Sequence, residues 1–217
     1  EGEEPPYVVT SFLHGKHLTP EQVQAFSSDE KQKFATSVAE FAYQMHMQLS
    51  IDEARQLRQK YQLDDLYEPP WPIYFEGVLA RQLDKPKQNG LAHEYYERWK
   101  NAKITNDVIV LHDDLHPDNM LFDGNRLVGV LDFADTDIGP PEQELRQLYR
   151  LGDEILDMTA AHYEQLSGQK LNREAIRLWA IMQDLAAYIN RSDQKDHPSF
   201  IRATGNLNTW IPEGEWG

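Results

Sequence analysis

Three side chains that carry oxygen atoms could act together in metal-assisted chemistry. Asp114 and Asn119 lie five residues apart after a strand-like apolar run, and Asp132 follows Asn119 by thirteen residues. The segment 120–131 carries a central Asp-Gly-Asn turn signal and is typical of a β-hairpin, whose two ends lie close together. Amide and carboxylate oxygens suit Mg²⁺, which usually takes only one or two protein ligands. The spacing therefore predicts that Asn119 and Asp132 hold a magnesium ion, while Asp114 remains free to accept a hydroxyl proton.

This set of residue types suits phosphoryl transfer, because that reaction depends mostly on positioning and on the neutralisation of charge. Residues 108–134 contain five acids and a single base, Arg126, so the segment favours a bound cation. Taken one at a time, Asp and Asn are more often turn or cap residues. Their combination on one strand, loop and hairpin favours a catalytic site.

Two other classes of function fit parts of the same segment. His112-x-Asp114-x-His116 can be interpreted as the zinc site of a metallohydrolase, since zinc enzymes combine His and carboxylate ligands. That interpretation leaves Asn119 and Asp132 without a role, and the other six histidines show no paired spacing. The remaining class is a non-catalytic binding module, whose fold is kept for recognition alone.

The elements that position these residues are expected to be mostly helical. Apolar residues at helical spacing predict a long helix over 28–49, preceded by a short helix that begins at Thr19-Pro20. Further helices are expected near 74–84 and 91–103, from 141 to about 166, and over 172–190. Short strands are expected at 7–12, 108–111, 120–122 and 127–131, and the proline-rich segment 64–73 is expected to form a loop. The pattern indicates the α+β class, mostly α.

Composition limits the partners and the compartment. The chain has 217 residues and a net charge of -15, which would repel a nucleic acid backbone. It has no Cys, so disulfides and thiolate metal sites are excluded. No apolar run reaches the roughly 18 residues that a membrane helix needs, and the first residues lack the basic start of a signal peptide. We therefore expect a cytoplasmic protein with no membrane and no nucleic acid partner.

Three motifs in the chain resemble those of one enzyme family. The motifs are His112-x-Asp114-Leu115-His116-Pro117-x-Asn119, then Val130-Leu131-Asp132-Phe133, then Gly139-x-Pro141-x-x-Glu144-Leu145. Together they resemble the aminoglycoside phosphotransferase family, a relative of the choline kinases and protein kinases. The resemblance implies transfer of the γ-phosphate of ATP, or of another nucleoside triphosphate, to a hydroxyl of a small-molecule acceptor. It implies Asp114 as the catalytic base with His112 bracing the catalytic loop, Asn119 and Asp132 as Mg²⁺ ligands, and structural support from Gly139 and Glu144.

The same resemblance implies a division of the chain. Residues 19–217 would form a kinase-like C-terminal lobe with a small catalytic hairpin, and residues 1–18 the last strand and hinge of an N-terminal nucleotide lobe. The rest of that lobe is missing from the sequence, which contains no G-x-G-x-x-G motif and no P-loop. The isolated chain is therefore expected to have little kinase activity.

The acidity of the chain favours a cationic, aminoglycoside-like acceptor, whose ammonium groups carboxylates would hold by charge-assisted hydrogen bonds. The candidate acceptor contacts are His116 and six acids: Glu142, Asp153, Asp157, Asp184, Asp193 and Asp196. Three positions depart from the family's usual residues, with Asp113 in place of Gly and Pro140 and Glu144 in place of Asp. The carboxylate of Asp113 is expected to point outward, which would limit its repulsion of Asp114.

Overall fold

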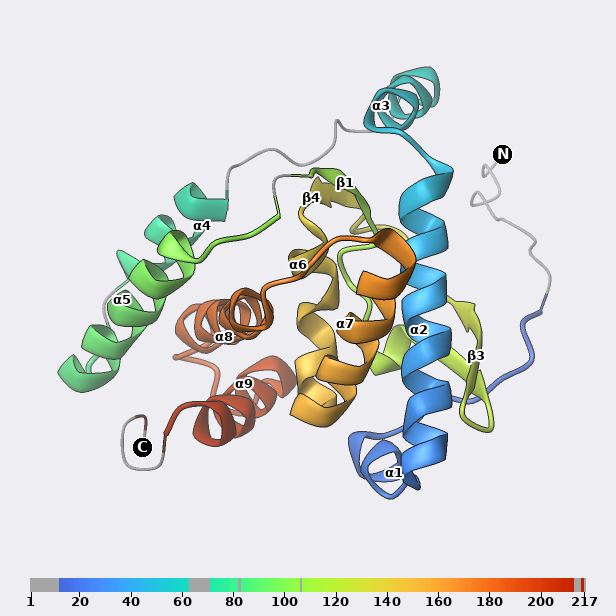
Figure 1. The fold of residues 1–217 in the computed structure, drawn as a ribbon. Coiled ribbons are helices and arrows are strands. Elements are labelled where there is room, and N and C mark those ends of the chain that lie inside the picture. Colours follow the sequence, from blue (N-terminus) through green and yellow to red (C-terminus); the bar gives the residue numbers. More distant parts are fainter. Residues whose placement is uncertain (1–11, 63–70, 82, 106, 213–215, 217) are drawn as a thin grey trace, which may run out of the picture.

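The computed structural model describes residues 12–62, 71–81, 83–105, 107–212 and 216. Its α-helices are α1 (Pro20–Gln24), α2 (Ser28–Gln48), α3 (Ile51–Lys60), α4 (Trp71–Leu79), α5 (Pro86–Asn101), α6 (Pro141–Glu144), α7 (Asp153–Ser167), α8 (Arg173–Asn190) and α9 (Pro198–Trp210). Two 3-10 helices are η1 (Pro117–Asn119) and η2 (Leu145–Leu151). The strands are β1 (Ile109–Leu111), β2 (Met120–Asp123), β3 (Arg126–Val130) and β4 (Asp137–Gly139). The predicted α+β class, mostly α, is confirmed (Figure 1).

Helix α2 forms as its sequence predicts. A capping box of Ser27 and Glu30 starts it, because each side chain accepts a hydrogen bond from the backbone of the other. The helix buries Phe34, Val38 and Ala42 on one face, which packs against α7 along most of its length (Figure 1). The cap predicted at Thr19 likewise starts α1.

Two small antiparallel sheets frame the loop 112–119. Strands β2 and β3 form the predicted hairpin, with Met120 opposite Val130 and a tight turn in which Gly124 has a φ of 60°. Glycine suits that position because a side chain is disfavoured at positive φ. Strand β1 pairs with β4, placing Ile109 opposite Gly139. Loop 112–119 therefore leaves one sheet and enters the other.

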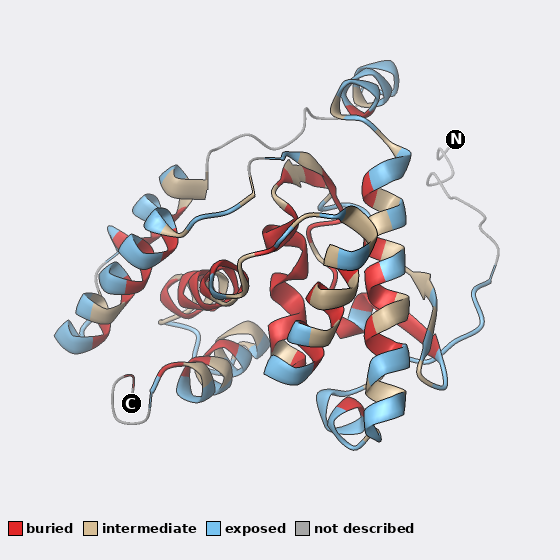
Figure 2. Ribbon diagram, in the orientation of Figure 1, coloured by how far each residue is buried: buried red, intermediate tan, exposed pale blue. Residues whose placement is uncertain are grey.

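The described hydrophobic core has two large clusters and a small one at Ala54 and Val110, and the described buried residues gather on α6, α8 and the inner faces of α2 and α7 (Figure 2). One large cluster joins α2, α7, η2 and β2, and it includes Leu115 from the loop 112–119 and Met120 from the start of β2. The other large cluster joins α4, α5, α8 and α9 around Trp99 and Trp179, with Trp71 at its edge. The first cluster therefore anchors the loop 112–119 through Leu115, and the second anchors Trp71.

Several elements differ from expectation. Helices α3 and α9 and strand β4 were not predicted, and the helix expected from 141 to 166 is interrupted at Gly152, whose φ of 91° ends η2 before α7 begins. Residues 71–73, expected in a loop, begin α4. The predicted strand 7–12 and the rest of the proline-rich loop lie almost entirely outside the described residues. In the described part of the predicted hinge, Lys16 pairs with Phe122 through two backbone hydrogen bonds of 2.9 Å. No helix among the described residues is long and apolar enough to cross a bilayer.

Candidate active site

His112 braces the loop that follows β1. Its side chain is fully buried, and its Nε2 lies 2.9 Å from the backbone carbonyl of Leu131. Its Nδ1 accepts a hydrogen bond of 3.3 Å from the backbone N–H of Asp114. Because Nδ1 is an acceptor there, the proton of the neutral ring is on Nε2. Both ring nitrogens therefore contact backbone groups, and the imidazole connects the loop 112–119 to Leu131, which follows strand β3.

Glu144 fixes the start of the loop 112–119 from the protein interior. Its fully buried carboxylate accepts the backbone N–H of His112 at 2.7 Å, and its Oε2 lies 3.3 Å from Nε2 of His46. The other ring nitrogen of His46 lies 2.9 Å from the hydroxyl of Tyr163. Burial and the charge of Glu144 raise the pKa of Tyr163, so its hydroxyl stays protonated and can donate. This chain of buried polar groups connects α2, α7 and the start of the loop 112–119.

Asp114 has both carboxylate oxygens held in place while the residue stays half-buried. Its Oδ2 accepts from Nδ2 of Asn119 at 3.0 Å and lies 3.2 Å from Nε2 of His116, and its Oδ1 accepts from Nε2 of Gln147 at 3.1 Å. Burial alone would raise the pKa of Asp114, but the His116 contact and the charges of Arg146 and Arg150 outweigh it and lower the pKa below its ordinary value. Asp114 is therefore an ionised, oriented acceptor at neutral pH.

A backbone hydrogen bond joins Asn119 to Leu131, the residue that precedes Asp132. The N–H of Leu131 donates to the carbonyl of Asn119 at 2.8 Å, so Asp132 follows directly beside Asn119 at the open end of the hairpin. No hydrogen bond among the described residues uses Oδ1 of Asn119, whereas its Nδ2 donates to both the carbonyl and the carboxylate of Asp114. Asp132 is exposed and has a φ of 61°, a conformation that costs free energy in a residue with a side chain and that often occurs at functional sites.

This donor set fits a magnesium ion. An amide oxygen and an exposed carboxylate at one edge are hard ligands, and Mg²⁺ commonly completes its shell with water and phosphate oxygens. Among the described residues no three His, Asp or Glu side chains gather as a metal site would require, so the zinc interpretation of His112, Asp114 and His116 lacks its ligands. A magnesium site needs fewer protein ligands than this, so Asn119 and Asp132 remain candidate magnesium ligands.

Asp113 does not point outward, so that expectation was wrong. Its carboxylate is buried against Arg146, whose Nη1 contacts Oδ1 and whose Nη2 donates to the Asp113 carbonyl at 2.6 Å. Gln143 adds a hydrogen bond of 2.8 Å to Oδ1. Burial still raises the pKa of Asp113 above its usual value, despite the opposing charge of Arg146. The φ of 64° explains why glycine suits this position, and the contacts with Arg146 explain how an aspartate is held there.

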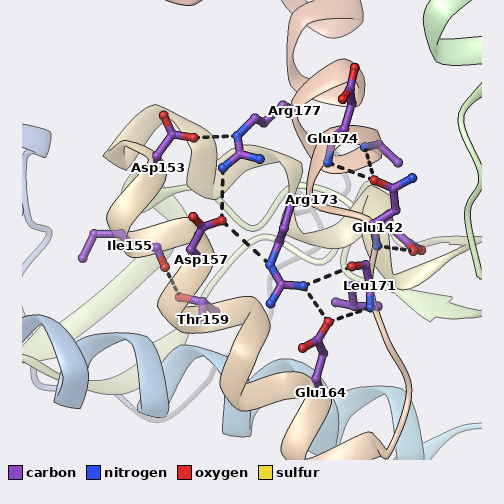
Figure 3. Close-up of polar contacts among 12 residues, drawn as sticks. Glu142, Asp153, Ile155, Asp157, Thr159, Glu164, Leu171, Arg173, Glu174 and Arg177 are labelled. Atoms are coloured by element: carbon purple, nitrogen blue, oxygen red, sulfur yellow. Dashed lines mark hydrogen bonds and ion pairs between the residues drawn. The ribbon is translucent and has the colours of Figure 1, made fainter.

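The six acids nominated as acceptor contacts have varied surroundings. Glu142 is fully buried, where its oxygens accept from Thr105 and from the backbone N–H of Asn172, which caps α8. Asp184 is also buried, and it is held by Asn206 at 2.7 Å and faces Arg150 at 3.5 Å. Ion pairs hold the exposed acids Asp153 and Asp157 to the half-buried Arg177, and Asp157 also pairs with Arg173, as Figure 3 shows. Asp193 and Asp196 are exposed after α8.

A cavity of about 430 Å³ opens at Asp114, and different acids line it. We name it the aspartate cavity. Its charged walls are Arg58, Asp113, Asp114, Asp135, Asp137 and Arg146. Sequence reasoning did not single out Asp137 or the supporting residue Gln147, since neither lies in the motifs. No local signal identifies them, because Asp137 arrives through the unpredicted strand β4 and Gln147 through the turn of η2.

Gly139 offers a test of how tightly the site is packed. A Cβ atom on Gly139 would lie 2.9 Å from Cδ1 of Leu111 and would collide with the amide of Gln143, which Asp113 holds. We expect Gly139→Ala to lower the free energy of unfolding by about 1–3 kcal/mol. Urea denaturation measures the change. The matched control is Gly90→Ala, in an exposed part of α5 with nothing within 4 Å, which should raise stability by about 0.5–1 kcal/mol. Equal stability of Gly139→Ala and the unmodified protein would contradict this packing.

Comparison with known proteins gives a family and a set of folds. The family model described as "Phosphotransferase enzyme family" matches residues 1–204. Comparison with curated proteins gives no match. Among the solved structures that share the fold at low sequence identity, three illustrate the range. The GDP complex of aminoglycoside 2'-phosphotransferase-IIIa is 16% identical with a TM-score of 0.70, over 92% of this chain and 68% of that one.

The other two structures show a comparable level of similarity. The streptomycin-ATP-APH(2")-IIa ternary complex is 19% identical with a TM-score of 0.57, over 88% of this chain and 67% of that one. The apoenzyme of macrolide 2'-phosphotransferase MphH from Brachybacterium faecium is 17% identical with a TM-score of 0.60, over 96% of this chain and 74% of that one.

Proposed function

The chain belongs to the phosphotransferase enzyme family, and on that premise we propose that it transfers the terminal phosphoryl group of a nucleoside triphosphate to a hydroxyl group of a small cationic acceptor. The observation that carries the proposal is Asp114. Its carboxylate lines the aspartate cavity, and Asn119, His116 and Gln147 fix its direction. An ionised carboxylate held in this way can receive a hydroxyl and orient it for attack on phosphorus.

Asp114 is suited to orientation more than to early proton removal. A carboxylate with a lowered pKa is a weak base, and the transition state of phosphoryl transfer is loose, so the hydroxyl keeps its proton until late in the reaction. The role of Asn119 would be double, because its Nδ2 steadies Asp114 while its Oδ1 remains available to a metal. His112 would keep both ends of the segment in register through its two backbone contacts.

Asn119 and Asp132 are the residues that would hold Mg²⁺. When bound, the ion would neutralise charge on the phosphate groups. Solved relatives hold GDP, or streptomycin together with ATP, so adenine and guanine nucleotides are both candidates here. The four acids of the aspartate cavity against its two bases favour a cationic acceptor.

The test of this proposal is phosphate transfer with γ-labelled ATP and GTP in the full-length protein. Acceptors are drawn from a panel of hydroxyl-bearing amines. We expect a labelled phosphate ester that forms with Mg²⁺ and is lost when EDTA removes the metal. Isothermal titration of each nucleotide, with and without Mg²⁺, separates binding from transfer. Saturable acceptor binding without any labelled product would support a binding module and contradict the proposed transfer.

A further inference from the structure

A second cavity adjoins the aspartate cavity. It has a volume of about 530 Å³, and its walls include Trp71, Trp99, Trp179, Ile138 and Pro140, so we name it the tryptophan cavity. Trp71 and Asp137 line both cavities and therefore form the boundary between them. A molecule with a hydroxyl beside Asp114 could extend past this boundary into the tryptophan cavity.

Asp137 is a buried acid that forms no ion pair with a described Lys, Arg or His side chain. Its residue is 3% exposed, and its Oδ1 has no hydrogen-bond partner among the described residues. Burial raises the pKa of Asp137 to about 6, so the carboxylate is still mostly ionised at neutral pH. The charge of Asp113 also raises this pKa, whereas the charges of Arg146 and Arg58, which line the aspartate cavity, lower it. Buried carboxylates are normally paired with a cation, and this one keeps an oxygen without a described hydrogen-bond partner where the two cavities meet.

The walls around Asp137 suit an ammonium group on an apolar body. Indole faces attract cations, and aromatic walls bind apolar surface. Lys100 also lines the tryptophan cavity. Its Nζ lies 3.6 Å from Oε1 of Glu97 and over the ring of Tyr96, and these two contacts partly offset its positive charge. A heavily hydroxylated sugar would find few hydrogen-bond partners among these mostly apolar walls.

We propose that the tryptophan cavity binds the apolar body of an amine-bearing acceptor, and that the carboxylate of Asp137 pairs with the acceptor's ammonium group. The inference rests on the proposed function only for the position of the acceptor's hydroxyl beside Asp114. In this arrangement Asp137 selects acceptors that carry a positive charge. It also replaces the polycationic amino sugar expected from composition with an apolar amine.

The test compares two ligands of nearly equal shape, benzylamine and benzyl alcohol, by the fluorescence of the tryptophans. The full-length protein is titrated without nucleotide, so the result does not depend on phosphoryl transfer. We expect benzylamine to bind at least about tenfold more tightly than benzyl alcohol. Asp137→Asn should remove this preference while changing the Kd of benzyl alcohol less than about twofold.

Two further variants locate the effect. Asp135→Asn removes an exposed carboxylate from the same loop and should keep the preference for the amine. Trp71→Leu removes an aromatic wall and should weaken both ligands. Equal affinity of the unmodified protein for the two ligands, no saturable binding of either, or a preference that survives Asp137→Asn would overturn the proposal. A thermal midpoint for Asp137→Asn at or above that of the unmodified protein shows that the variant is folded.

Discussion

Replacing Asp114 with asparagine is expected to reduce the rate of phosphoryl transfer by about 10²–10⁴-fold. Asparagine keeps the size of the side chain and can still accept one hydrogen bond from Gln147 or Asn119, but it cannot take the proton of the acceptor hydroxyl. The KM for nucleotide should change little, because the carboxylate acts on the acceptor. Steady-state kinetics with both substrates varied separate the two parameters.

The control for this variant is Asp118→Asn. Asp118 lies in the same loop and carries the same charge, but its side chain is 89% exposed, and its one ion-pair contact among the described residues is with His116, at 3.6 Å. Its replacement should leave kcat within about twofold. If Asp114→Asn retained activity similar to that of Asp118→Asn, the base would have to be sought elsewhere in the aspartate cavity.

The parts of the site that could be predicted are those whose geometry is local. Asp114, Asn119 and Asp132 lie on one loop and one hairpin, and the turn at Gly124 sets the register that brings the hairpin's ends together. The start of α2 was predictable for the same reason, since its capping box involves residues three apart. Helix α3 has a similar box at Ser50 and Glu53, a signal that was present in the sequence and overlooked.

The parts that could not be predicted depend on contacts between distant residues. Asp113 was expected to face solvent because nothing beside it in sequence could pair with it, yet Arg146 reaches it from η2. Strand β4 has only three residues and exists because it pairs with β1 across the whole hairpin. The position of Asp137 in the site depends on that pairing, which places it opposite Leu111. Hydrophobic periodicity carries no information about such long-range pairs, which depend on tertiary packing.

Asp132 is the residue whose loss should most change the dependence on metal. It is exposed beside Asn119, and its left-handed backbone holds the carboxylate at the end of the hairpin. If it is a direct magnesium ligand, its removal should cost more than the roughly 10–100-fold loss typical of residues that only support a ligand. Asp132→Asn keeps an oxygen but loses the negative charge, so its defect should be milder.

We therefore expect Asp132→Ala to lower the rate of transfer by more than about 100-fold at millimolar Mg²⁺, and Asp132→Asn to recover part of its activity as Mg²⁺ is raised. The measurement is the Mg²⁺ concentration at half-maximal rate, which a purely structural residue would leave unchanged. Asp123→Asn, an exposed acid at the turn of the same hairpin, is the matched control and should show the unmodified dependence. The contrary result is that Asp132→Ala loses rate while Asp132→Asn has the same half-maximal Mg²⁺ concentration as the control. That result would mean that Asp132 shapes the end of the hairpin and that other ligands hold the metal.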